Sequence, residues 1–119
     1  MIDIHTHTNY SDGSSTVSEL LEEAQTKGLT LLSITDHNTI AAYHELANPE
    51  IRNKFRGSII PGVEITTTYN GEPIEVLGYG FDLNKMQKLL KENVLTFENK
   101  QLKEFDLIKN QYRKIGVKF

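Results

Sequence analysis

The chain contains no cysteine, which excludes disulfides, thiolate zinc sites and cysteine nucleophiles together. No apolar run approaches the roughly 20 residues that a membrane-spanning helix needs, so we expect no membrane association. The first residues lack both the basic stretch and the apolar stretch of a secretory signal, which predicts a cytoplasmic protein. Walker loops, nucleophile elbows and aromatic RNA-binding motifs are also missing from the sequence.

The chain does have an ordinary globular composition with an uneven distribution of charge. Its 119 residues are 38% hydrophobic and 24% charged, which suits one small domain or part of a larger one. The net charge of −3 argues against general nucleic-acid binding. Residues 1–83 carry 12 acidic and 4 basic side chains, whereas residues 84–119 carry 9 basic and 4 acidic ones. An acidic cluster of this kind either solubilises a surface or collects divalent cations.

Hydrophobic periodicity predicts an α/β chain whose elements follow the order β-α-β-α-β-β. Strands that are separated by helices pair in parallel, and this rule is the basis of the assignment. A polar helical stretch is expected to follow, from about residue 84 to residue 115. The expected strands cover residues 1–7, 29–35, 58–68 and 73–81, and the expected helices begin at Val17 and Ile40.

Three local signals mark where these elements begin and turn. Thr16 followed by Glu19 forms a capping box, which predicts the N-terminus of the first helix. Thr39 is expected to cap the second helix. Asn70-Gly71 is the strongest turn signal in the chain and predicts a hairpin between the last two strands.

Two histidines and an aspartate lie at the end of the first expected strand. His5 and His7 are two positions apart, so on a strand their side chains point to one face and can share a cation. Asp12 lies in the loop that leaves this strand, where its carboxylate can face both rings. Taken singly, the His-x-His pair is also compatible with polar residues at a strand end, and Asp12-Gly13 with a common turn.

Further candidates lie at the ends of the later strands. His37 follows the second expected strand, and Asp36 either caps a helix or orients His37. Glu64 interrupts an apolar strand, where a carboxylate needs a partner or a metal unless it lies at a wet edge. Glu75 repeats this situation one strand later. His44 lies in a polar helix pattern and is interpreted as a surface residue.

Together, three histidines and three acids fall at strand ends or in the loops beyond them. In parallel α/β folds, functional sites gather where strands end and loops begin. A set of nitrogen and oxygen ligands without sulfur suits manganese, zinc or iron. The sequence therefore predicts a divalent-metal site formed by His5, His7, Asp12, His37, Glu64 and Glu75. The assignment of Glu75 is provisional.

The order and spacing of these residues resemble the PHP family, which is named after polymerase and histidinol phosphatase. The resemblance extends from residue 1 to about residue 83 and is strongest to the stand-alone phosphoesterase branch. It rests on five motifs, His5-x-His7, Ser11-Asp12-Gly13, Thr35-Asp36-His37-Asn38-Thr39, Pro61-Gly62-Val63-Glu64-Ile65 and Val76-Leu77-Gly78-Tyr79.

The resemblance implies the N-terminal portion of a distorted (β/α)7 barrel with up to three divalent metals at the C-terminal ends of its strands. Residues 1–83 would form this portion, and residues 84–119 resemble the start of the family's helical insertion. The implied activity is hydrolysis of phosphate esters by a metal-activated water. The implied substrates are small phosphorylated molecules, nucleotides or short oligonucleotides, and Mn²⁺ is favoured over Zn²⁺ or Fe²⁺.

The resemblance also implies individual roles. His5 and His7 would hold one metal, Glu64 would bridge it to a second, and Asp12 and His37 would help hold a third. All five would act in catalysis through the bound metals.

The chain departs from the family pattern in two ways. Glu75 stands where the family has a histidine, so it is either a ligand with altered metal preference or a non-ligand acid. No histidine follows His44, so the later family ligands are absent, and a closed barrel needs roughly 250 residues. We therefore expect part of a longer protein, or a half-domain that pairs with a partner or a second copy. The alternative function is a non-catalytic module that binds a metal or a protein.

The basic helical stretch has two interpretations. Lys85, Lys88 and Lys91 are spaced along a helix, which is typical of a solvated face and only weakly indicates a nucleic-acid contact. The apolar residues of the stretch are interpreted as packing positions, namely Met86, Leu89, Leu90, Phe105, Ile108, Tyr112 and Ile115.

Overall fold

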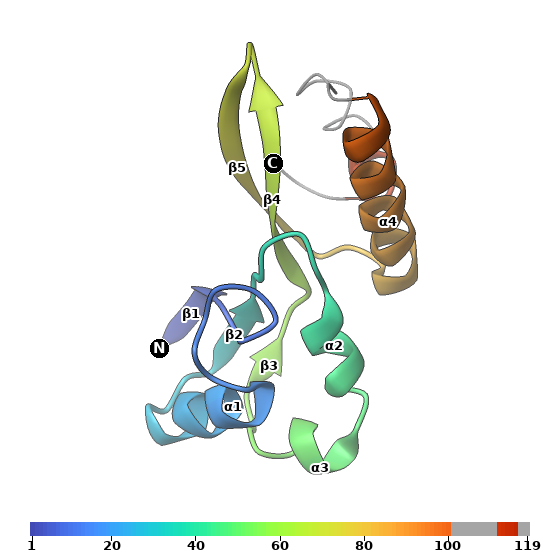
Figure 1. Ribbon diagram of the computed structural model, residues 1–119. Helices are drawn as coiled ribbons and strands as arrows, with labels where there is room; N and C mark the ends of the chain where they lie inside the picture. The colour runs from blue at the N-terminus through green and yellow to red at the C-terminus, as the bar shows by residue number, and fades with distance from the viewer. Residues whose placement is uncertain (101–111, 117–119) are drawn as a thin grey trace.

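The computed structural model of the chain describes residues 1–100 and 112–116 (Figure 1). For residues 93–100 it describes the backbone, and for the others it describes the side chains as well. The elements are, in chain order, β1 (Ile2–Thr6), α1 (Val17–Thr26), β2 (Leu31–Ile34), α2 (Ala41–Glu45), α3 (Pro49–Arg52), β3 (Ser58–Ile59), β4 (Gly62–Tyr69), β5 (Glu72–Tyr79) and α4 (Leu83–Lys100). This order confirms the predicted α/β chain. It differs in having one more short helix, α3, and in dividing the third expected strand into β3 and β4.

The first sheet is parallel, as predicted, and has the strand order β1-β2-β3. Helices α1, α2 and α3 surround it in the lower half of Figure 1. Helix α1 begins at the predicted capping box, in which Thr16 and Glu19 each accept a hydrogen bond at 3.1 Å from the other's backbone N–H. Because this box satisfies two N–H groups that a helix start leaves open, the end of the loop after β1 is fixed.

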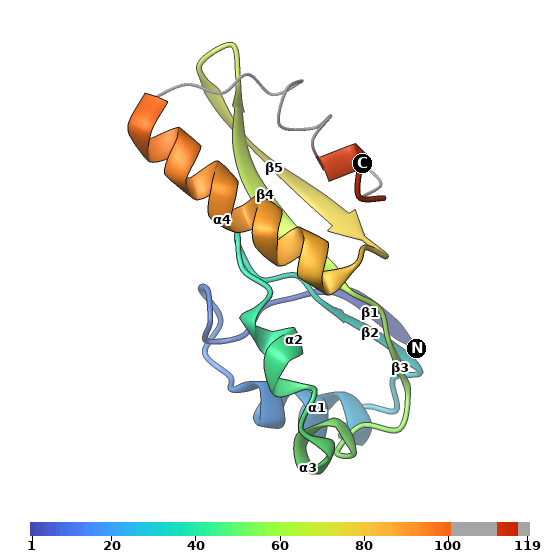
Figure 2. The same ribbon diagram turned by 90° about the vertical axis from the view of Figure 1, so that its right-hand side faces the viewer.

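The second sheet is a two-stranded antiparallel hairpin, β4-β5, which extends away from the parallel sheet (Figures 1 and 2). Its register runs from Gly62 opposite Tyr79 to Tyr69 opposite Glu72. Asn70 and Gly71 form the turn with φ angles of 51° and 80°. These left-handed conformations are the ones that a tight hairpin turn needs, so the predicted turn is confirmed.

The expected strand over residues 58–68 is divided at Pro61. Proline has no backbone N–H and cannot continue a ladder, and β3 ends at Ile59. Gly62 then begins β4 so close to β2 that a Cβ at this position would clash with Ser33 Oγ. The chain therefore crosses from the parallel sheet into the hairpin at a point where only glycine fits.

The Tyr43 hydroxyl on α2 joins the two sheets at this crossing. It accepts hydrogen bonds from Ile34 N at 3.0 Å and from Gly62 N at 2.9 Å, and it donates toward the Ile34 carbonyl at 2.7 Å. Burial raises the pKa of Tyr43 to about 12, so the hydroxyl stays protonated over the whole physiological range. The first residue of β4 is thus fixed to the last residue of β2 through one buried side chain.

Helix α4 lies along the hairpin in both views (Figures 1 and 2). Met86 and Leu90 are buried, whereas Lys85, Lys88 and Lys91 are exposed, as expected for a solvated face. Among the other expected packing positions, Tyr112 is buried, Leu89 and Ile115 are partly buried against the core, and Phe105 and Ile108 lie outside the described residues. The core is formed by Val17, Leu21, Ala24, Leu32, Ile34, Ile40, Ala42, Tyr43, Phe55, Val63, Ile65, Phe81, Met86, Leu90 and Tyr112.

Two expectations concern α2. The prediction that Thr39 caps this helix is wrong, because Ile40 is the N-cap and offers no side-chain hydrogen bond. Thr39 Oγ1 instead accepts a hydrogen bond from Ala41 N at 3.2 Å. His44 is exposed, as predicted, with Nε2 3.2 Å from Gln87 Oε1 on α4.

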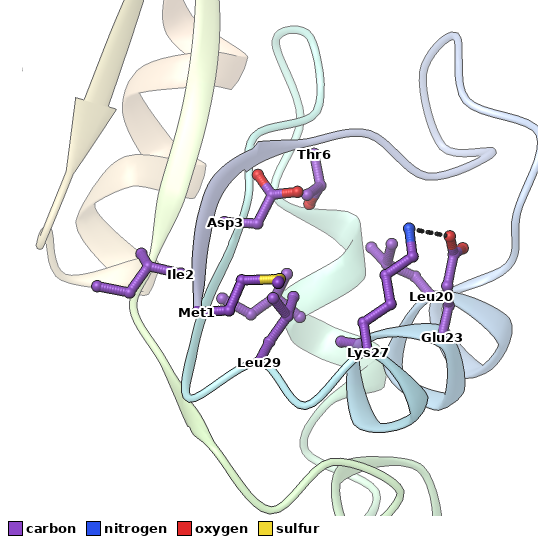
Figure 3. Close-up of a pocket in the computed structure, with 10 residues that line it drawn as sticks. Met1, Ile2, Asp3, Thr6, Leu20, Glu23, Lys27 and Leu29 are labelled. Atoms are coloured by element: carbon purple, nitrogen blue, oxygen red, sulfur yellow. Dashed lines mark ion pairs between the residues drawn. The ribbon is translucent and has the colours of Figure 1, made fainter.

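Strand β1 has an open side. Among the described residues it pairs with β2 alone, and Ile2 and Ile4 are exposed. A cavity of about 200 Å³ lies between β1 and α1, next to the Glu23–Lys27 ion pair of 2.7 Å (Figure 3). This open edge agrees with the expectation of a partial barrel. No helix within the described ranges is long and apolar enough to cross a membrane.

Candidate metal centre

The six candidate ligands converge where the parallel sheet meets the hairpin. His5 lies in β1, His7 lies just beyond the end of β1, and Asp12 lies in the loop that leads to α1. His37 follows β2, and Glu64 is the third residue of β4. Glu75 lies in β5, so four segments bring their side chains to the C-terminal ends of β1 and β2, the edge expected for a site in a parallel α/β sheet.

Glu64 is the centre of this cluster. Its residue is only 6% exposed, so the alternative of a wet strand edge is wrong. Its Oε1 lies 2.8 Å from His5 Nε2 and 3.3 Å from His7 Nε2. Its Oε2 lies 3.7 Å from His37 Nδ1. The two oxygens of one buried carboxylate thus face different histidines.

Asp12 connects the other side of the histidine group. Its Oδ2 lies 3.1 Å from His37 Nε2, and its Oδ1 lies 3.5 Å from His7 Nδ1. The rings of His7 and His37 stack with centroids 4.6 Å apart and an interplanar angle of 14°. The loop aspartate therefore does face histidines, as its place in the sequence predicts.

Glu75 of β5 stands at the solvent side of the same cluster. Its Oε1 lies 3.5 Å from His37 Nδ1, and its carboxyl group shares a hydrogen bond with Glu64. This hydrogen bond, partial desolvation and the charge of Glu64 raise the pKa of Glu75. Burial acts to raise the pKa of Glu64, but hydrogen bonds with Glu75 and His5 and the charges of His37 and His5 outweigh it and lower that pKa. The pair is therefore arranged so that Glu64 ionises first.

Asp36 has neither of the two roles considered from the sequence. It is buried and accepts hydrogen bonds from Thr8 N at 2.6 Å, Thr8 Oγ1 at 2.6 Å and Ser11 Oγ at 2.7 Å. It therefore fixes the loop that carries Asp12 to the end of β2. The sequence did not predict the contacts of Asp36 with Thr8 and Ser11, and the available signal was two small hydroxyl side chains between His7 and Asp12.

The donor atoms fit a group of divalent cations. Three sets of three residues each offer ligand atoms within 4.8 Å of one another, namely His5, His7 and Glu64; His7, Asp12 and His37; and His37, Glu64 and Glu75. Nδ1 of His7 is buried and has no hydrogen-bond partner among the described residues. Asp12 Oδ1 lies 3.5 Å from it without forming a hydrogen bond, and a buried ring nitrogen in this state is destabilising unless something binds it. The surrounding donors are the nitrogen and oxygen ligands that Mn²⁺, Zn²⁺ and Fe²⁺ accept.

The chain is similar in sequence to curated proteins. Over 92 residues the chain is 39% identical to a 5′-3′ exoribonuclease of Haemophilus influenzae, covering 75% of this chain and 32% of that protein. Over 81 residues it is 30% identical to a 3′,5′-nucleoside bisphosphate phosphatase of Chromobacterium violaceum, covering 68% of this chain and 28% of that protein. The chain therefore spans about a third of the length of the curated relatives that it matches.

Solved structures and the family comparison agree with the sequence relatives. A protein of Bifidobacterium adolescentis described as a metal-dependent phosphoesterase superposes with a TM-score of 0.65 at 29% identity, over 76% of this chain and 32% of that one. The PHP domain family matches residues 3–114, which is nearly the whole sequence. The partial barrel, the converging histidines and carboxylates, and these similarities agree, and the chain belongs to the PHP domain family.

Proposed function

We propose that this chain carries the metal-binding part of a phosphoesterase active site. The observation that supports the proposal best is the convergence of three histidines and two further carboxylates around one buried carboxylate, Glu64. Divalent cations bound there would activate a water and neutralise charge on the phosphoryl oxygens of an ester. We assign the binding of these cations to residues 1–83 and treat 84–119 as the helical segment beside them.

Each proposed ligand has a distinct part in this centre. His5 and His7 would hold one cation, since an imidazole nitrogen of each faces Glu64 Oε1. Glu64 would also serve a second cation, because its Oε2 faces the other way, toward His37. Asp12 and His37 would help to hold a third, and Glu75 would contribute to the second. The catalytic roles that we propose, all through the bound cations, are those of His5, His7, Asp12, His37 and Glu64, and Glu75 is proposed as a metal ligand only.

The ligand chemistry favours manganese. Imidazole nitrogens bind zinc, iron and manganese, whereas carboxylates suit the harder Mn²⁺. Glu75 adds a third carboxylate to the cluster, in a place next to Glu64 and His37. We therefore propose Mn²⁺ ahead of Zn²⁺ or Fe²⁺.

The proposed substrate is a small phosphate ester of a nucleotide or a short oligonucleotide. The names of the relatives support this class, since they describe action on RNA and on a nucleoside bisphosphate. The exposed side chains of His5, Asp12 and Glu75 leave the cluster open to solvent, so a phosphate can approach. The remaining ligands of a complete centre would come from a longer chain or from a second copy beside the open edge of β1.

Metal content per chain, measured by elemental analysis of protein purified without chelators, tests the metal centre. We expect at least about one equivalent of manganese, zinc or iron in the unmodified chain, and loss of it in His7→Ala. His44→Ala is the matched control, because it removes an exposed histidine on α2 that belongs to no ligand group. Absence of metal in the unmodified chain, or equal loss in both variants, would contradict the proposal.

Hydrolysis tests the activity separately. A nucleoside bisphosphate and a short single-stranded RNA are incubated with the chain and Mn²⁺, and phosphate release and RNA cleavage are measured. Turnover that disappears in His7→Ala supports the phosphoesterase. Bound metal without turnover supports the alternative, a metal-binding module that is non-catalytic by itself.

A further inference from the structure

A short backbone contact between β4 and the loop after β2 places Glu64 in the centre. Glu64 N donates to the Asp36 carbonyl at 3.1 Å, and Asn38 N donates to the Glu64 carbonyl at 2.9 Å. These two bonds form an isolated parallel bridge between His37 and Glu64. The backbone of the loop therefore continues β2 for one step against β4, at the residue that lies in the middle of the metal cluster.

The side chain of Asn38 extends this bridge by one more step. Its Oδ1 accepts a hydrogen bond from Thr66 N at 2.9 Å, and its Nδ2 donates to Thr66 Oγ1 at 3.2 Å. The backbone of Asn38 is left-handed, with φ of 55°, so the chain turns away here and its own peptide groups cannot continue the ladder. Asparagine tolerates this conformation better than most side chains and mimics a peptide group, which explains why it can take over the pairing.

We propose that Asn38 is a positioning residue that docks β4 onto the end of β2, so that the Glu64 carboxylate reaches His5, His7 and His37. The loop after β2 thus holds β4 at two points, at the backbone of Glu64 itself and, through the Asn38 side chain, at Thr66 two residues later. A shift of β4 by even one residue would turn Glu64 to the opposite face of the strand. The inference rests on the proposed function for the identity of the bound metal, and the contacts that carry it are present without one.

The buried Tyr43 does not position Glu64 by itself. It fixes Gly62, two residues before Glu64, to Ile34. Tyr43 and the two backbone bonds at Glu64 hold the start of β4, whereas the Asn38 side chain adds an attachment further along the strand, at Thr66, which fixes the direction of the hairpin. Metal-ligating groups need supporting contacts of this kind, and losing one commonly weakens metal binding about 10- to 100-fold.

Asn38→Gly tests the inference, because glycine keeps the left-handed backbone and removes only the two side-chain hydrogen bonds. Asn70→Gly is the matched control, since Asn70 has nearly the same φ, 51°, at the hairpin turn. We expect Asn38→Gly to weaken Mn²⁺ binding about tenfold by isothermal titration calorimetry. We expect Asn70→Gly to stay within about twofold of the unmodified chain.

The His5 ring resonances of the metal-free protein are the second readout. His5 Nε2 lies 2.8 Å from Glu64 Oε1, so the ring nitrogen chemical shift reports whether the carboxylate is in place. We expect this shift to move in Asn38→Gly and to stay unchanged in Asn70→Gly. The inference is overturned when either readout is unchanged in Asn38→Gly, or when Asn70→Gly shows the same changes.

Failure of the proposed function has a different signature. If the unmodified chain binds no Mn²⁺, the proposed metal centre fails, and the His5 shift alone then decides the role of Asn38. If Asn38→Gly does not fold by circular dichroism, Thr66→Val replaces it, because valine removes the hydroxyl acceptor and keeps the backbone N–H. We then expect Mn²⁺ affinity to fall about threefold and the same His5 chemical shift to move by a smaller amount. If both stay unchanged in Thr66→Val, the inference is overturned.

Discussion

The parallel sheet and the β4-β5 hairpin bring different chemistry to the same place. The parallel sheet and its loops supply the three histidines and Asp12, whereas the hairpin supplies Glu64 and Glu75. The central strand of the sheet, β2, is almost entirely buried, whereas β5 of the hairpin is exposed or half-buried at every residue except Gly78. The parallel sheet therefore owes its geometry mainly to core packing around β2, whereas the hairpin combines the packing of Val63 and Ile65 on β4 with a few hydrogen bonds at the crossing.

This difference explains how a polar site is kept in a small protein. His37 follows the buried strand β2 and is held by the hydrophobic core beneath it, whereas His5 and His7 are placed by the pairing of β1 with β2. A buried carboxylate beside them destabilises the folded protein unless its strand is held in place and its charge is compensated. Glu64 meets both conditions, with histidine nitrogens at 2.8 and 3.3 Å and backbone pairing on both sides. The junction between the two sheets is thus where substitutions should have the largest effects.

Glu64→Gln is expected to have the largest effect. Glutamine keeps the shape but removes the charge that the proposed cations would share, so Mn²⁺ affinity should fall by at least about 100-fold in calorimetry. Glu72→Gln, an exposed substitution on β5, is the control and should bind as the unmodified chain does. An equal affinity in Glu64→Gln would show that the hairpin is not needed for binding.

The pKa of Glu64 gives the same variant a signature in pH. Because folding lowers this pKa, the ionised carboxylate stabilises the metal-free fold at pH values above the ordinary glutamate pKa of about 4.5. That stabilisation is lost as the pH falls through the lowered, folded-state pKa. In urea unfolding below pH 4.5, the unmodified chain should lose stability more steeply than Glu64→Gln does. Parallel curves for the two proteins would contradict the lowered pKa.

Tyr43→Phe tests the other attachment of the hairpin. Removing the hydroxyl leaves the buried N–H groups of Ile34 and Gly62 without their acceptor, which should lower the free energy of unfolding by about 1–3 kcal/mol in urea. Because Asn38 and the bridge at Glu64 remain, the Mn²⁺ affinity of the folded protein should change less than threefold. A large loss of affinity would show that the buried attachment, and not the surface one, places Glu64.

Glu75→Gln is expected to separate binding from stability. The carboxylate is a proposed ligand, so its loss should weaken Mn²⁺ binding about tenfold. Folding raises the pKa of Glu75, which means that ionising it beside Glu64 destabilises the fold. The metal-free variant should therefore unfold at a higher temperature than the unmodified chain at pH 7. This difference should vanish below pH 4.5, where Glu75 is protonated in both the folded and unfolded states. A lower unfolding temperature at pH 7 would contradict this account.

The sequence predicted the elements of the parallel region, and the convergence of its histidines and acids, more completely than the junction. Periodicity and the capping box give β1, α1 and β2, because these elements depend on local patterns. The metal candidates were found because histidines and acids at strand ends are unusual residue types in that place. Pro61 was visible, but the separation of β3 from β4 depends on which sheet each half joins, and this is a tertiary choice.

Side-chain partners far apart in the sequence were the least predictable. Asp36 contacts Thr8 and Ser11, and Asn38 contacts Thr66, over separations of 25 to 28 residues. Their residue types allow local roles such as caps and turns, so no single pattern could assign them. The same reason explains the wrong cap at Thr39, where the helix begins one residue later than its best capping side chain.

Thr16→Ala is expected to have the smallest effect and to sharpen the comparison from the side of the parallel sheet. The substitution removes the hydroxyl that accepts from Glu19 N, and it should lower the free energy of unfolding by about 1 kcal/mol. The cap lies at the far end of the loop that carries Asp12, yet Asp36 holds the near part of that loop through Ser11. The position of Asp12 should therefore survive, and Mn²⁺ affinity should stay within about twofold. Loss of affinity in this variant would mean that helix α1, and not the contact with Asp36, fixes the aspartate of the centre.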